Sequence, residues 1–275
     1  MKLVLPISHL FDDKDILRIN DFKCIDTYQL RKTSNLDVFY KFYTSLLNPQ
    51  DIIYHDVKGV FEHDFLDSLD SILVRSNNCY EYPMSVPCFY STSLSPACVD
   101  VDISGYNGLY LNNSEAKLPE ELYELFKQRI SFMRRIFNYC LKDLSFENTA
   151  YRDIYDAYKY ITDSLFISEV IFDNDVGFTL DIAHAIITCR QKNISIKDYF
   201  KDLPLKKCKE IHISTPNGVD DVHDLPNKEI MTYLDYVLNY IPSEESKYVY
   251  LVCEYYKDFE VLKKFYNEEM QKYAN

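Results

Sequence analysis

The chain has 275 residues, 47% of them hydrophobic and 27% charged, so it can bury a full-sized core without disulfides or a structural metal. Its net charge of −13 excludes the broad basic surface of a non-specific nucleic-acid binder. No stretch reaches the roughly 20 consecutive apolar residues that span a bilayer, and the apolar run at residues 1–6 is too short for a signal peptide. We therefore expect a cytoplasmic protein with no membrane or nucleic-acid partner.

Short β-branched and apolar segments alternate with amphipathic helical segments along the chain. The candidate strands are residues 2–5, 24–28, 51–54, 108–111, 144–147, 177–181, 210–214 and 248–254. The clearest helix is predicted over residues 118–141, where apolar side chains recur at helical spacing behind Pro119 in the first turn. Residues 76–104 are rich in Asn, Pro, Ser and Tyr without a clear period, so we expect a long loop or insertion there.

The order of these segments predicts the fold class. Strands that alternate with helices form parallel βαβ units, and eight such units close into a barrel. The chain has only 5 glycines and no Gly-, Ser- or Pro-rich run that would mark a linker. We expect an α/β protein, a single (β/α)8 TIM barrel over residues 1–275, with its functional site at the C-terminal ends of the strands.

Ionisable side chains recur at or just after the ends of the predicted strands. They are His55, Glu147, Asp181, His184, His212, Asp221, His223 and Glu254. The strand-end residues from Glu147 onward follow one another at about 30 to 40 residues, close to one βα unit, so their side chains should converge on one face of the barrel. Because converging carboxylates and imidazoles cannot stay buried without partners, this pattern predicts a metal site.

The residue types also restrict the metal. Mixed histidine and carboxylate ligation suits iron, zinc or manganese, and the candidates include no cysteine, which disfavours a closed structural zinc site. The 8 cysteines of the chain contain no C-x-x-C pair, and we expect them to be reduced thiols.

Several of these segments resemble a known family. Phe146-Glu147-Asn148, then Ser168-Glu169-Val170, then residues 177–185 (GFTLDIAHA), are similar to the multinuclear non-heme iron-dependent oxidative enzymes, the methanobactin-biosynthesis-oxidase-like family. The similarity continues through residues 199–204 to the runs 210–214 (EIHIS) and 221–223 (DVH). It covers roughly residues 118–254 and is weak over the first hundred. The wider superfamily includes endonuclease IV and the xylose-isomerase-like barrels.

The resemblance implies a central site with four catalytic residues. Glu147 would bridge two metals, and Asp181, His212 and Glu254 would complete the central site.

The resemblance implies two further metal positions. His184, Asp221 and His223 would hold a third metal, and His55 would belong to the remaining site. The family has a second histidine there, at the end of the fourth strand, whereas this chain reads GLYLNN at residues 108–113, which makes Asn112 or Asn113 the candidate in its place. Asn112 and His9, which lies near the end of the first strand, are also candidate substrate contacts.

The chemistry that the resemblance implies is oxidative. Two or three iron ions in mixed ferrous and ferric states, with dioxygen as co-substrate, would modify a cysteine or other residue of a ribosomally synthesised precursor peptide. A leader-binding partner protein often delivers such a peptide. Zinc or manganese is the alternative metal.

Three other functions remain open. A metal-dependent phosphodiesterase resembling endonuclease IV would use the same ligands, but the acidic chain shows no Arg/Lys run to contact a DNA backbone. A sugar isomerase or epimerase would use Glu147 and Glu254 as an acid/base pair, although such enzymes need fewer metal ligands. A degenerate barrel without activity would serve as a binding partner.

Overall fold

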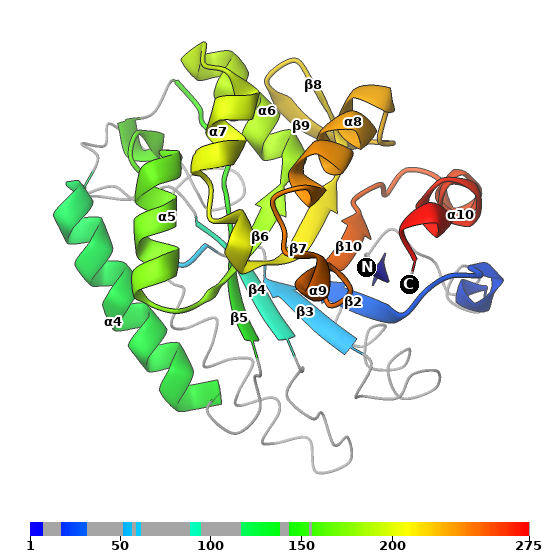
Figure 1. The fold of residues 1–275 in the computed structure, drawn as a ribbon, viewed down its shortest axis with the longest axis horizontal. Coiled ribbons are helices and arrows are strands. Elements are labelled where there is room, and N and C mark those ends of the chain that lie inside the picture. Colours follow the sequence, from blue (N-terminus) through cyan, green and yellow to red (C-terminus); the bar gives the residue numbers. More distant parts are fainter. Residues whose placement is uncertain are drawn as a thin grey trace, which may run out of the picture.

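The computed structural model describes residues 1–7, 18–31, 52–56, 59–61, 89–94, 117–137, 143–153 and 156–274. Within this part, parallel strands close into a barrel in the order β1-β10-β7-β6-β5-β4-β3-β2 (Figure 1). The strands are β1 (Lys2–Ile7), β2 (Thr27–Arg31), β3 (Ile52–Asp56), β4 (Phe89–Ser93), β5 (Asp143–Glu147), β6 (Gly177–Asp181), β7 (Cys208–Ile213) and β10 (Tyr250–Cys253). The predicted (β/α)8 barrel is confirmed.

Helices surround the barrel (Figure 1). The α-helices are α4 (Pro119–Phe137), α5 (Ser164–Asp173), α6 (Ile182–Lys192), α7 (Ile196–Asp202), α8 (Lys228–Leu238), α9 (Ser243–Ser246) and α10 (Phe259–Glu268). Short 3-10 turns are η1 (Ile19–Asp21), η4 (Asp156–Tyr158), η5 (Leu205–Lys207) and η6 (Met270–Tyr273). None of the helices in the described ranges is long and apolar enough to cross a membrane.

The fourth barrel strand differs from the expectation. It is Phe89–Ser93, which pairs with β3 and β5 and lies within residues 76–104, where we expected a loop. The predicted strand at residues 108–111 lies outside the described residues. The strand was missed because three of its five residues are Ser91, Thr92 and Ser93, whose hydroxyls hide the apolar pattern of a buried strand.

Side-chain carboxylates and amides fix where several helices begin. Asp163 precedes α5 and accepts hydrogen bonds from the backbone N–H groups of Leu165 and Phe166, both at 3.0 Å. Asn227 caps α8 in the same way through the N–H of Ile230. Such caps satisfy backbone donors that have no partner within the helix, which is why these residue types precede helices.

Alternation along the strands builds two different interiors. Outward-facing residues such as Phe146, Phe178 and Ile211 are fully buried against the helices in the main hydrophobic core. Inside the barrel, Val4, Ile53, Phe89 and Val252 form a small apolar cluster. Other buried positions on the strands are polar, among them Gln29, His55, Ser91, Ser145, Glu147, Thr179, Asp181, Glu210 and His212.

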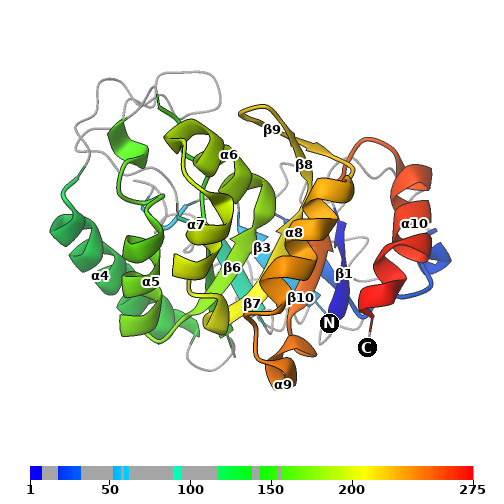
Figure 2. The same cartoon turned by 45° about the horizontal axis from the view of Figure 1, so that its top comes forward.

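A short antiparallel hairpin, β8 (Thr215–Asn217) and β9 (Asp220–Asp224), follows β7. Figure 2 shows it projecting from the end of the barrel that lies away from both termini. Gly218 turns the hairpin with a φ of 63°, a conformation that costs glycine little. Because the hairpin directly follows the C-terminal end of β7, it lies at the face where the C-terminal ends of the strands meet.

Candidate metal centre

The structure brings together all eight of the strand-end residues predicted from the sequence. Successive contacts join them in the order His55, Glu147, His212, Glu254, His223, Asp221, His184 and Asp181, with nitrogen–oxygen distances from 2.7 to 3.8 Å. They come from β3, β5, β7, β9, the start of α6 and the ends of β6 and β10. His9 and Asn112, the candidate substrate contacts, lie outside the described residues.

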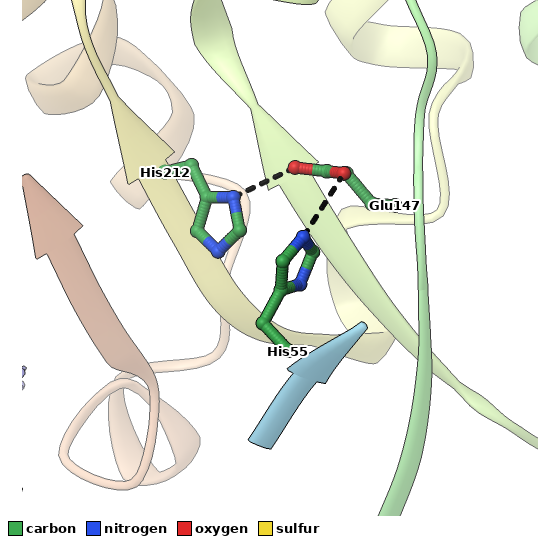
Figure 3. A group of neighbouring side chains, drawn as sticks. All are labelled: His55, Glu147 and His212. Carbon is green, nitrogen blue, oxygen red and sulfur yellow. Dashed lines mark hydrogen bonds and ion pairs between the residues drawn. The ribbon is translucent and has the colours of Figure 1, made fainter. Parts of the chain in front are cut away.

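The centre of the network is the imidazole of His212. Its Nδ1 lies 2.7 Å from Glu147 Oε1 and 3.1 Å from Glu254 Oε1. His55 approaches the other side of Glu147, with its Nε2 3.7 Å from Oε2. Figure 3 shows both imidazoles directed at this one carboxylate. Ser93 Oγ donates to Glu147 Oε2 at 2.7 Å, so a residue of β4 also holds this side chain.

A second group gathers around Asp221. Its Oδ2 lies 3.1 Å from His184 Nε2 and 3.3 Å from His223 Nε2. The same His223 nitrogen is 3.1 Å from Glu254 Oε2, which links this group to the central one. His223 has a φ of 48°, an unusual conformation for a residue with a side chain, and such strain tends to persist where function requires it.

Hydrogen bonds of both the side chain and the main chain fix Asp181 in place. Its Oδ1 accepts a hydrogen bond of 2.8 Å from the backbone N–H of His184, which caps α6 and places His184 beside the network. Its own main chain is held by Asn148, whose side-chain oxygen accepts from the N–H of Asp181 at 2.8 Å. The Asp-x-x-His spacing thus follows from a helix that begins directly at the end of a strand.

Opposite charges control the ionisation of Glu147 and His212. Burial opposes the charged form of Glu147, but the neighbouring His212 and His55 hold the pKa of its carboxyl well below the usual range. Burial likewise opposes protonation of His212, yet Glu210 and Glu147 raise its pKa to about 9. Both pKa shifts favour an ion pair between the Glu147 carboxylate and the protonated imidazole of His212.

Asp181 and Asp221 differ although both are carboxylates in one network. Burial raises the pKa of Asp181 to about 6, and the charges of Asp221 and Glu147 add to this against the opposing effect of His184. Burial opposes the charged form of Asp221, but its hydrogen bond with His184 and the charges of His184 and His223 together lower its pKa to about 2. Shifts of carboxyl pKa values in opposite directions within one cluster are typical of functional sites.

The donor set fits a divalent cation. Three overlapping groups of side chains each place their ligand atoms within 4.8 Å of one another: His55, Glu147 and His212; Glu147, Asp181 and His184; Asp181, His212 and Glu254. Oδ2 of Asp181 and Oδ1 of Asp221 are buried and accept no hydrogen bond. Within the described residues these groups contain no cysteine. Carboxylates and imidazoles of this kind suit zinc, manganese or ferrous iron.

One carboxylate of the site, Glu210, is not among the residues predicted from the strand ends. Glu210 is fully buried inside the barrel and lies 3.3 Å, Oε1 to Nε2, from His212. The signal that would have found it is its position two residues before His212, since residues i and i+2 of a strand share a face.

Solved structures with the same architecture were found across nearly the whole chain. A xylose isomerase domain-containing protein from Salmonella typhimurium LT2 has a TM-score of 0.62 at 10% identity, covering 98% of this chain and 95% of its own. The IolI protein, whose structure contains a zinc atom, has a TM-score of 0.58 at 14% identity, covering 100% and 94%. The 3-keto-D-glucoside 4-epimerase YcjR from E. coli has a TM-score of 0.57 at 9% identity, covering 97% of both chains.

These likenesses show that the chain has the barrel fold of the xylose-isomerase-like proteins, and at such identities they show the fold alone. No family model and no curated protein sequence matches the chain. The expected similarity to the multinuclear iron oxidases therefore has no support from these comparisons, and the isomerases and epimerases share the fold.

Proposed function

We propose that this protein is a metal-dependent isomerase or epimerase that acts on a sugar or a related polyhydroxy carbonyl compound. The observation that carries the proposal is the buried set of Glu147, Asp181, His212 and Glu254 at the C-terminal mouth of the barrel. The fold that the chain shares with a 3-keto-D-glucoside 4-epimerase and a D-tagatose 3-epimerase-like protein supports it. Fold likeness is an analogy, and the chemistry depends on these residues.

These four side chains would hold one divalent metal through three carboxylates and one imidazole. The bound metal would polarise a substrate carbonyl and its neighbouring hydroxyl, which makes the adjacent C–H more acidic. The small apolar cluster of Val4, Ile53, Phe89 and Val252 packs inside the barrel beneath this site.

The reaction needs a base on one side of the substrate carbon and an acid on the other. Glu254 and Glu147 are the candidates, since they approach the central imidazole from β10 and from β5. Glu254 Oε2 lies 3.1 Å from His223 Nε2, and the side chain of His223 is 31% exposed. A proton taken up by Glu254 can therefore pass to His223 and on to solvent.

The experiment uses protein stripped of metal and reloaded with Mn²⁺, Zn²⁺, Co²⁺ or Fe²⁺. Each form is incubated in D₂O with a panel of ketoses and keto-glycosides, and deuterium at the carbon beside the carbonyl is measured by NMR. We expect metal-dependent exchange that Glu254→Gln abolishes and that Glu244→Gln, at an exposed position on α9, leaves unchanged. Absence of exchange with every sugar in every metal form would reject the proposal.

A second candidate function rests on the ligands beyond the central four. His184, Asp221 and His223 meet in one group, and His55 faces the outer side of Glu147. This surplus favours a multinuclear centre, and with two or three iron ions the protein would be a dioxygen-using oxidase of a ribosomally made precursor peptide, delivered by a leader-binding partner. Elemental analysis and Mössbauer spectroscopy of anaerobically purified protein distinguish the two. A ferric–ferrous pair supports the oxidase, and a single zinc or manganese ion supports the isomerase.

A further inference from the structure

Glu210 is a buried carboxylate that the proposed reaction does not use. It lies inside the barrel with 0% of its surface exposed, one layer below the metal-capable groups. Gln29 Nε2 on β2 donates to its Oε1 at 2.5 Å, and Thr179 Oγ1 on β6 donates to its Oε2 at 3.3 Å. A charge so deeply buried is costly, and partners from several strands offset the cost.

Glu210 contacts the nitrogen of His212 that faces away from the metal-capable groups. His212 Nε2 lies 3.3 Å from Glu210 Oε1, whereas Nδ1 points at Glu147 and Glu254. An imidazole that ligates a metal through one nitrogen carries its proton on the other, and an acceptor at that second nitrogen fixes the tautomer. Glu210 is placed to be this acceptor.

The same carboxylate also reaches His55 through one intermediate. Ser91 on β4 hydrogen-bonds Glu210, and its Oγ lies 2.8 Å from His55 Nδ1. The other nitrogen of His55, Nε2, faces Glu147 Oε2 at 3.7 Å. Both imidazoles that point at Glu147 in Figure 3 thus have a partner deeper in the barrel, Glu210 for His212 and Ser91 for His55.

We propose that Glu210 is a positioning residue for the metal centre, which fixes His212 with Nδ1 as its ligating nitrogen and, through Ser91, orients His55. The inference rests on the metal centre of the proposed function and is independent of the reaction catalysed there. Partners of metal-bound histidines commonly change metal affinity by about 10- to 100-fold when they are replaced.

The test compares Co²⁺ binding by wild type and Glu210→Gln, measured by competition with a chelator, together with the visible spectrum of the bound cobalt. Glutamine has the same shape and keeps an oxygen for Gln29, so the variant should fold. We expect affinity to fall by about 10- to 100-fold and the cobalt bands to shift. Thr162→Val is the control, because it removes another buried hydrogen bond, to Tyr158 O, without contacting the centre. We expect that variant to bind as wild type does.

A measurement on the wild type avoids any dependence on the folding of the variant. In the zinc-loaded protein, ¹⁵N NMR of histidine should show His212 with its proton on Nε2 and the metal on Nδ1. Ligation through Nε2, or a Glu210→Gln variant with unchanged affinity and spectrum, would overturn the inference. Failure of the wild type to bind any metal would instead reject the metal centre itself.

Discussion

Replacing Asp181 by asparagine should stabilise the metal-free protein while weakening its hold on a metal. Asp181 is 1% exposed, and its Oδ2 accepts no hydrogen bond. Burial and the charges of Asp221 and Glu147 raise its pKa from 3.8 to about 6. Asparagine removes this unfavourable charge, and its side-chain oxygen can still cap α6 through the N–H of His184, since asparagine is as good a cap as aspartate.

The magnitude follows from the pKa of Asp181. The folded chain binds a proton at Asp181 more tightly than the unfolded chain, so its free energy of unfolding falls as the pH rises from 3.8 to about 6 and stays lowered above that. At about 1.4 kcal/mol for each pKa unit, the ionised side chain destabilises the fold by roughly 3 kcal/mol at pH 7.5. At pH 5 the penalty is about half of this.

Urea denaturation in EDTA at both pH values measures the effect. We expect Asp181→Asn to be more stable than wild type at pH 7.5 by up to roughly 3 kcal/mol, with a smaller gain at pH 5. Asp153→Asn, at an exposed position, is the control and should change little. Added metal should stabilise the wild type and not the variant, because only a folded site with all its ligands binds tightly. A variant less stable than wild type in EDTA at pH 7.5 would show that the ionised Asp181 does not destabilise the fold.

Three further predictions concern the centre and one helix. Burial opposes the protonation of His212, but neighbouring carboxylates raise its pKa to about 9, so a metal must displace a proton below that pH. Metal affinity should therefore rise about tenfold for each pH unit from 7 to 9, and a flat profile in competition titrations would contradict this. For the multinuclear centre of the second candidate function, Glu147→Gln should lower the occupancy of two metals together, whereas His223→Ala should empty mainly one, as elemental analysis will show; wild-type metal content in both variants would reject that centre. Asp163→Ala removes the cap of α5 and should cost about 1 kcal/mol in urea denaturation, and no loss would mean that the cap is dispensable.

Much of the candidate site was predictable from the strand ends. A parallel barrel brings the C-terminal ends of its strands to one face, so Glu147, Asp181, His212 and Glu254 were expected to meet once their strands were recognised. These strands carry apolar residues such as Phe146, Phe178 and Ile211 on the face that packs against the helices, a pattern that the sequence shows directly. The structure confirms that these side chains converge.

The fourth strand and Glu210 were not predictable in the same way. Ser91 and Ser93 are typical loop residues, because a serine hydroxyl is buried readily only when it has a hydrogen-bond partner. Their partners are His55 and Glu147 on neighbouring strands, which the local sequence does not show. Glu210 was not predicted to belong to the site. Its partners Gln29 and Thr179 are 181 and 31 residues away in sequence, so only the closed barrel makes its burial tolerable.

By itself, the sequence determined the alternation of strands and helices, and hence the barrel and the residues that gather at its mouth. Local periodicity and helix caps are sufficient for this, since they depend on neighbours in the chain. The tertiary structure decided how those residues pair. The left-handed backbone at His223 and the hairpin that carries it bring Asp221 to His184 and His223 to Glu254. Long-range contacts of this kind depend on the three-dimensional closure of the barrel, because a charge becomes buried and paired only when distant strands meet around it.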